Sequence, residues 1–133
     1  MTQRELLLKE LRGETIGTIT AQSSSEEIFQ NQVLRPILKL QNDLFIASLE
    51  NYINKNKRDF YTLSIEKKLL LIENAIQKDI KLRNALKGMI IALFSLEEYQ
   101  IYIQNSSNLN KRMMNMLIER IKNQIQLFEV VES

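Results

Sequence analysis

Cationic side chains gather in the middle of the chain, where they could hold phosphate groups. Residues 55 to 87 carry nine Lys and Arg against four acidic residues, a local charge of +5 that the other residues reduce to +2 for the whole chain. Basic surfaces of this kind bind nucleic acid or other phosphate-bearing molecules. The alternative is a solvated helix surface, because the charges lack the regularly interleaved aromatic residues and glycines of many such sites. The candidate residues are Lys55, Lys57, Arg58, Lys67, Lys68, Lys78, Lys81 and Lys87, with Arg83 beside them.

Four polar side chains interrupt apolar helical stripes and form a second candidate site. Gln41 lies in one predicted helix, and Glu73, Asp79 and Arg83 lie around a predicted kink in the next. If they line one cavity between helices, they would offer both charges and hydrogen-bond groups to a small polar ligand. The alternative is that Asp79 and Arg83, four residues apart, form an ordinary ion pair along one helix.

Residues 96–121 are a weaker candidate for a helix–turn–helix. Asn110, Lys111 and Arg112 would stand at the front of the recognition helix. The apolar residues that follow leave this helix only a narrow polar face. A structural helix is therefore the favoured interpretation, and the methionines at 113, 114 and 116 are expected in a core or a subunit interface.

The composition excludes most catalytic and cofactor chemistry. The chain has no Cys and no His, so it has no disulfide, no thiolate nucleophile, no Ser–His–Asp triad and no His- or Cys-ligated metal. The acidic pairs Glu26–Glu27 and Glu97–Glu98 are adjacent, which makes their side chains diverge on a helix instead of converging on magnesium. We therefore expect no catalytic residue, no metal and no cofactor, and favour a protein that is not an enzyme. Acid–base chemistry by Glu, Asp, Lys or Tyr and a metal site made only of carboxylates stay open as alternatives.

These residues are positioned by an all-α fold, since no segment alternates as a strand does. The 133 residues suffice for one domain, which we expect over 26–133 as a bundle of four to five main helices. Residues 1–25 form an N-terminal arm, with a short helix ending near Gly13 and a loosely alternating segment from 14 to 22. The arm is expected to be partly ordered or docked on a partner.

Cap signals set the predicted helix ends. Ser24 with Glu27 and Ser95 with Glu98 have the spacing of capping boxes, and Ser64 is a further cap. Pro36 must kink or divide the helix that begins near residue 26. A break is expected at 79–81, and the last helix is expected from about 109 to 128. Gly88 lies inside a helical run, where a close approach of another helix would explain it.

Four strings of the chain carry a resemblance to a known family. FQNQVLRPILKLQND (29–43), IENAIQKDIKLRNALKGMI (72–90), LEEYQIYI (96–103) and LNKRMMNM (109–116) resemble a family of small, uncharacterised all-helical bacterial proteins. Some members of that family are called glyoxalases. Such enzymes hold a metal with His and Glu on a βαβββ scaffold, and this chain has neither His nor strands to match. The resemblance therefore implies an all-helical fold and transfers no activity and no catalytic residue.

The leading expectation for function is a non-enzymatic interaction or scaffolding module. Broad apolar stripes on the 65–80 and 109–128 helices exceed what a small bundle easily covers, so we expect a homodimer, with the leucine-rich arm suited to exchange between subunits. Alternatively, we expect this apolar surface to bind an unidentified protein partner. The longest apolar run, 89–94, has six residues, where a membrane span needs about 20. We therefore expect a soluble, cytoplasmic protein without a membrane partner.

Overall fold

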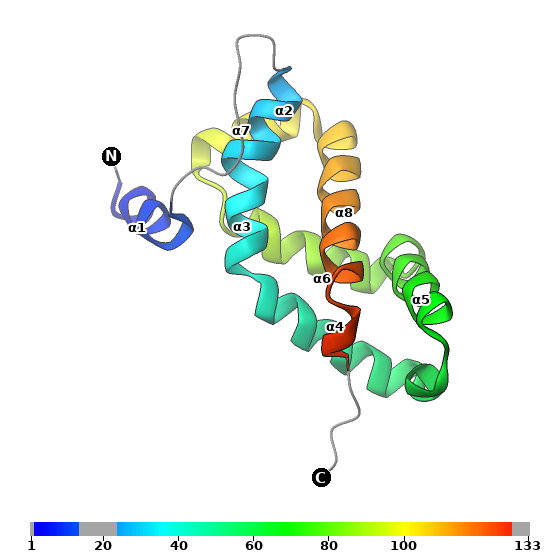
Figure 1. Cartoon of the computed structure of the whole chain (residues 1–133). Helices are drawn as coiled ribbons and strands as arrows, with labels where there is room; N and C mark the ends of the chain where they lie inside the picture. Colours follow the sequence, from blue (N-terminus) through cyan, green and yellow to red (C-terminus); the bar gives the residue numbers. More distant parts are fainter. Residues whose placement is uncertain (1, 14–23, 129–133) are drawn as a thin grey trace.

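The structure, a computed structural model, describes residues 2–13 and 24–128, and every element in these ranges is helical (Figure 1). The all-α prediction is confirmed. The expected set of four to five main helices is not confirmed, because breaks at Gln41 and Asp79 divide the longer stretches. The elements are α1 (Gln3–Arg12), α2 (Ser25–Phe29), the π-helical turn η1 (Gln30–Leu34), α3 (Arg35–Leu40), α4 (Asn42–Asn56), η2 (Arg58–Thr62), α5 (Ile65–Lys78), α6 (Ile80–Ile91), α7 (Leu96–Gln104), α8 (Ser106–Lys122) and η3 (Ile125–Leu127).

Side-chain caps begin three of the helices where the sequence predicts them. The hydroxyls of Ser24, Ser64 and Ser95 accept the backbone N–H three residues on, and only Ser95 also completes the reciprocal box with its Glu. The carboxylate of Asp79 caps α6 in the same way. These bonds satisfy N–H groups that have no partner inside the helix. The last helix differs from the prediction, since it begins at Ser106 without a side-chain cap and ends at Lys122.

Pro36 changes the helix in which it sits without ending it. The turn before it, Gln30–Leu34, widens into a π-helix, and the chain then continues as α3. Proline has no N–H, so the carbonyl of Gln32, four residues earlier, cannot receive the usual α-helical bond from it. That carbonyl instead accepts a hydrogen bond from the guanidinium of Arg12, at 3.2 Å. The proline thereby provides a docking point for α1.

The core is built around α8, which contacts η1, α5, α6 and α7. Its inward face consists of apolar side chains at helical spacing, and both Met113 and Met114 are buried in it. The methionine stripe is thus core in this chain, one of the two places expected for it. The buried residues of α8 are Leu109, Met113, Met114, Leu117, Ile118 and Ile121.

The ends of the predicted 65–80 stripe are exposed, and the expectation of close packing at Gly88 is wrong. Ile65 and Ile80 were expected inside the broad stripe, and they are 65% and 73% exposed. Each is the first residue of its helix, directly after the capping residue. Gly88 does not mark a close helix approach, because a Cβ built on it meets no atom within 4 Å.

The arm predicted at residues 1–25 is described in part. A helix is present over Gln3–Arg12 and ends at Gly13, whose φ of 71° favours glycine. Helix α1 lies against α3 of the same chain, with Leu8 buried. The predicted alternating segment from 14 to 22 lies outside the described residues. Within residues 2–13 and 24–128, no helix combines the length and the apolar character needed to cross a bilayer.

Candidate functional site

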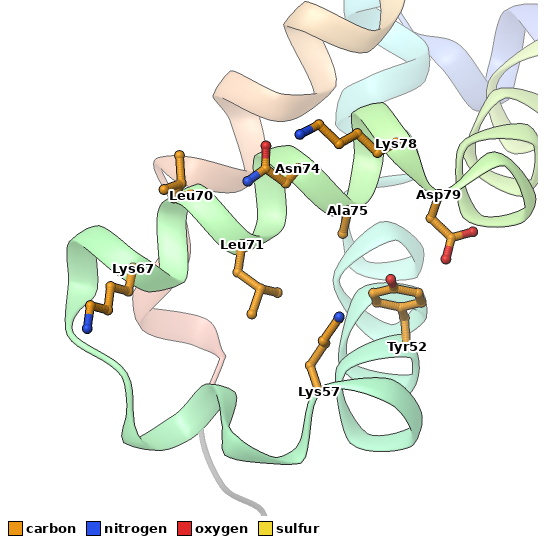
Figure 2. Close-up of a pocket in the computed structure, with 9 residues that line it drawn as sticks. All are labelled: Tyr52, Lys57, Lys67, Leu70, Leu71, Asn74, Ala75, Lys78 and Asp79. Carbon is orange, nitrogen blue, oxygen red and sulfur yellow. The ribbon is translucent and has the colours of Figure 1, made fainter.

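A hollow of about 510 Å³ lies between the end of α4 and α5 (Figure 2). In Figure 2, Leu71 and Ala75 of α5 point down toward Tyr52 and Lys57, which rise from the end of α4. The lining therefore combines an apolar surface with cations, an amide, a hydroxyl and one carboxylate. The residues are Tyr52, Lys57, Lys67, Leu70, Leu71, Asn74, Ala75, Lys78 and Asp79.

A second hollow, of about 370 Å³, lies between α4 and α6. It shares Tyr52 and Asp79 with the first hollow, so the two adjoin along this pair of side chains. It too has cations, amides and an apolar part. The residues are Ser48, Asn51, Tyr52, Lys55, Asn56, Asp79, Lys81, Leu82, Ala85, Leu86 and Met89.

The shared pair stands where α5 breaks and α6 begins. Asp79 has an extended backbone, and its Oδ1 accepts the N–H of Leu82 at 3.1 Å, which fixes the carboxylate at the start of α6. Burial and the neighbouring Asp79 carboxylate raise the pKa of Tyr52, since both disfavour a phenolate. Tyr52 is therefore protonated at neutral pH and can donate a hydrogen bond. Tyr52 was not singled out from the sequence, so its place in this site was missed.

Five of the eight lysine and arginine candidates line these hollows. Lys57, Lys67 and Lys78 line the first, and Lys55 and Lys81 line the second. Among the lining residues, Asp79 alone carries a negative charge. The hollows therefore have an excess of positive charge. This excess depends on how the helices are arranged and not on the order of the residues alone.

The remaining basic candidates have other positions. Lys68 lies over the ring of Phe60, 5.5 Å from its centroid, which is a cation–π contact. Lys87 is half-buried on α6 and lines neither hollow. The side chain of Arg58 lies outside the described part of the structure. Lys68 and Lys87 therefore do not belong to the site assembled here.

Helix geometry explains some of these lysines and leaves two without a local reason. Lys55, Lys57 and Lys78 are at or next to helix C-termini, where the partial negative charge of the helix end favours cations. Lys67 and Lys81 stand in the first turns of α5 and α6, where the helix dipole disfavours them. Both side chains are exposed, and none of the ion pairs found among the described residues involves them.

The four polar residues predicted to share a ligand cavity are not brought together. The amide of Gln41 donates to the carbonyl of Met89 at 3.0 Å and thus ties the α3–α4 junction to α6. Glu73 lies 4.0 Å from Lys122 of α8. Asp79 lines both hollows, and Gln41, Glu73 and Arg83 line neither. Helical spacing showed that each residue interrupts an apolar stripe, but it could not show which neighbouring helix each one meets.

The alternative reading of Asp79 and Arg83 as an ion pair is also wrong. Among the described residues, no ion pair joins them, because the Asp79 carboxylate is directed to the N–H of Leu82. The Nε of Arg83 is buried without a hydrogen-bond partner. Arg83 is therefore assigned no role in the site.

The front of α8 is occupied by contacts within the molecule. Arg112 donates to Glu26 and Gln30, and Asn110 accepts the hydroxyl proton of Tyr102. The amide of Asn105 has the largest effect on the pKa of Glu26 and lowers it, burial opposes this effect, and the Arg112 guanidinium lowers the pKa further, so the pKa lies below its usual value. These bonds join α2 to the start of α8, so two of the three predicted recognition residues are engaged. The helix–turn–helix interpretation loses its support.

The chain was also compared with known families, curated proteins and solved structures. No family model, no curated protein and no solved structure matches the chain. The family resemblance carried by the four strings accordingly stays an expectation. In the described residues, no three acidic side chains come together in a group that could hold a metal ion.

Proposed function

We propose that this protein binds nucleic acid through the two lysine-lined hollows, Tyr52 and Asp79 included. The observation that carries the proposal is that five lysines, from α4 and its C-terminal end, from α5 and from α6, line two adjoining concave surfaces. Concave sites of about 300–1,000 Å³ are typical of ligand binding. The non-enzymatic character expected from the composition is part of the proposal.

The phosphodiester backbone is the chemistry that such lysines recognise. Ammonium groups on flexible stems act as point charges toward phosphate and require no single geometry. Binding of this kind releases counterions, so the affinity falls steeply as salt is added. With up to five lysines in contact, the logarithm of the association constant is expected to fall by several units per decade of salt.

The test replaces the two lysines that have no local structural reason. We expect K67A/K81A to weaken binding of a labelled oligonucleotide by about tenfold at about 50 mM salt, and to reduce the salt slope by about two. Both lysines oppose their helix dipoles, so their loss should leave the stability of the fold unchanged or slightly higher. Fluorescence anisotropy over a salt series measures the first effect, and thermal unfolding measures the second.

The matched control is K39A/K111A, which removes the same charge from exposed positions outside the hollows. The proposal requires this variant to bind within about threefold of the wild type, because long-range charge is largely screened. Equal weakening by both variants would show non-specific attraction to a basic protein. Absence of binding by the wild type at about 50 mM salt would end the proposal.

A second candidate, self-association, is favoured by exposed apolar residues on α7. Leu96, Tyr99 and Ile103 recur at spacings of three and four and are 63%, 43% and 49% exposed. Helix α1 adds Leu7 and Leu11, which are also exposed. Exposed apolar residues of this kind are typical of subunit contacts when they form one surface. Because α1 docks on its own chain, α7 and not exchange of the arm is the proposed contact.

Light scattering coupled to size exclusion tests this second candidate. The wild type is expected to have about twice the monomer mass at about 100 µM, and L96E/I103E to be monomeric, because a charge in an apolar contact loses its hydration. L40E/L44E changes two other exposed leucines in the same way and should stay dimeric. A monomeric wild type, or dissociation by both variants, would refute an α7 contact.

A further inference from the structure

We propose that the ligand of the two hollows is single-stranded nucleic acid, with one nucleoside at Tyr52 and Asp79 and a phosphate on either side. This inference rests on the proposed function and narrows it to one form of nucleic acid. It also assigns different parts of one strand to different groups in the site. The structural basis is the order of charges across the hollows, from lysines through the Tyr52–Asp79 pair to lysines again.

The carboxylate of Asp79 separates the two sets of cations. It would repel a phosphate placed beside it, and it can accept a hydrogen bond from a base N–H or a sugar hydroxyl. Lys57, Lys67 and Lys78 line the first hollow, and Lys55 and Lys81 line the second, while Asp79 lines both. A chain in which uncharged, donor-bearing units alternate with phosphates matches this order.

The apolar part of each hollow favours a strand whose bases are free. Leu71 and Ala75 face the first hollow in Figure 2, and Leu86 and Met89 line the second. Tyr52 contributes its ring to both. Single-strand sites combine a positively charged groove with surfaces on which bases stack. In a duplex the base faces are already stacked, so this apolar surface would have no partner.

The experiment compares probes of the same length, of which the duplex carries twice the backbone charge of the single strand, so charge alone would favour the duplex. We expect a labelled 12-mer of oligothymidylate to bind about tenfold more tightly than its 12-base-pair duplex with oligoadenylate at the same salt. Inorganic polyphosphate of similar length, which has phosphates but no nucleosides, should also compete poorly. An oligouridylate 12-mer distinguishes RNA from DNA as the source of the strand, and tighter binding of either strand than of the duplex supports the inference.

The variant D79N tests the role of the carboxylate while keeping a residue that caps helices well. Loss of the repelling charge should raise the affinity for polyphosphate by about threefold or more. It should thereby narrow the difference in affinity between polyphosphate and the single strand. D59N removes the same charge from an exposed residue that lines neither hollow. This control should leave the difference in affinity between the two probes unchanged.

The outcomes separate this inference from the proposed function. If the duplex binds as tightly as the single strand while K67A/K81A weakens both, the lysine site stands and the single-strand inference is overturned. If polyphosphate competes as well as the oligonucleotide and D79N has no effect, the assignment of a nucleoside to Tyr52 and Asp79 is wrong. If no probe binds, both the function and the inference fail.

Discussion

Replacing Arg12 with alanine is expected to detach α1 from the rest of the molecule without unfolding the other helices. The Arg12 side chain is 11% exposed and makes a two-pronged ion pair with the Glu98 carboxylate. It also donates to the carbonyls of Leu93 and Gln32. Few other contacts of α1 reach the body of the protein, apart from the burial of Leu8 and the bond from Arg4 to the carbonyl of Ala92.

The expected effect is large because α1 cannot persist alone. An isolated helix of ten residues is marginal in water, so a detached α1 should lose its hydrogen bonds. Removing one partner of a largely buried ion pair costs several kcal/mol, and the partial exposure of Glu98 reduces this to about 2 kcal/mol. We therefore expect the amides of residues 3–12 to exchange about 30-fold faster with deuterium.

Hydrogen exchange read by mass spectrometry measures this opening segment by segment. The control is Arg4→Ala, which removes the same charge from the same helix but breaks one exposed hydrogen bond. It should accelerate exchange of α1 only a few-fold. Unchanged protection of residues 3–12 in R12A would contradict the account of how α1 is held.

Replacing Asn42 with alanine is expected to lower the free energy of unfolding by about 2 kcal/mol. Its amide donates to Oε1 of Gln124 at 2.7 Å, and its Oδ1 accepts from Nε2 of Gln124 at 2.8 Å and from Nε of Arg120 at 2.9 Å. Loss of the amide leaves part-buried groups of both residues without partners, which costs about 1–3 kcal/mol. Asn42 therefore joins the α3–α4 junction to the end of α8.

Urea unfolding measures this change, with Asp43→Ala as the control. Asp43 is the exposed neighbour of Asn42 in the first turn of α4. Its loss should cost no more than about 1 kcal/mol, the usual value of a favourable charge at a helix start. A stability loss in N42A that does not exceed the loss in D43A would refute the structural role assigned to the amide pair.

Local features of this fold follow from the sequence, because each depends on a few neighbouring residues. The caps at Ser24, Ser64 and Ser95 were found from spacing alone, and so was the break at 79–81. The capping role of Asp79 follows from the same chemistry. The widened turn before Pro36 was expected only as a kink, because several distortions can accommodate a missing N–H.

Contacts between helices are what the sequence could not supply. Gln41 interrupts an apolar stripe because it reaches a carbonyl on α6, and a helical wheel cannot name that partner. Gly88 was misjudged for the same reason. A glycine inside a helix looks the same in the sequence whether the space beside it is open or filled by another helix. The basic segment was recognised, but its division into lysines that line the hollows and lysines such as Lys68 that do not depends on how α4, α5 and α6 meet.

The most direct test of the nucleic-acid site is a map of where a single strand touches the protein. Amide resonances of nitrogen-15-labelled protein, followed during titration with the oligothymidylate 12-mer, report contact residue by residue. The account predicts that the largest shifts fall on Tyr52, Lys67, Asp79 and Lys81, with little change in α1 and α7. Shifts concentrated instead around Lys111 at the front of α8, with the hollows unaffected, would contradict it.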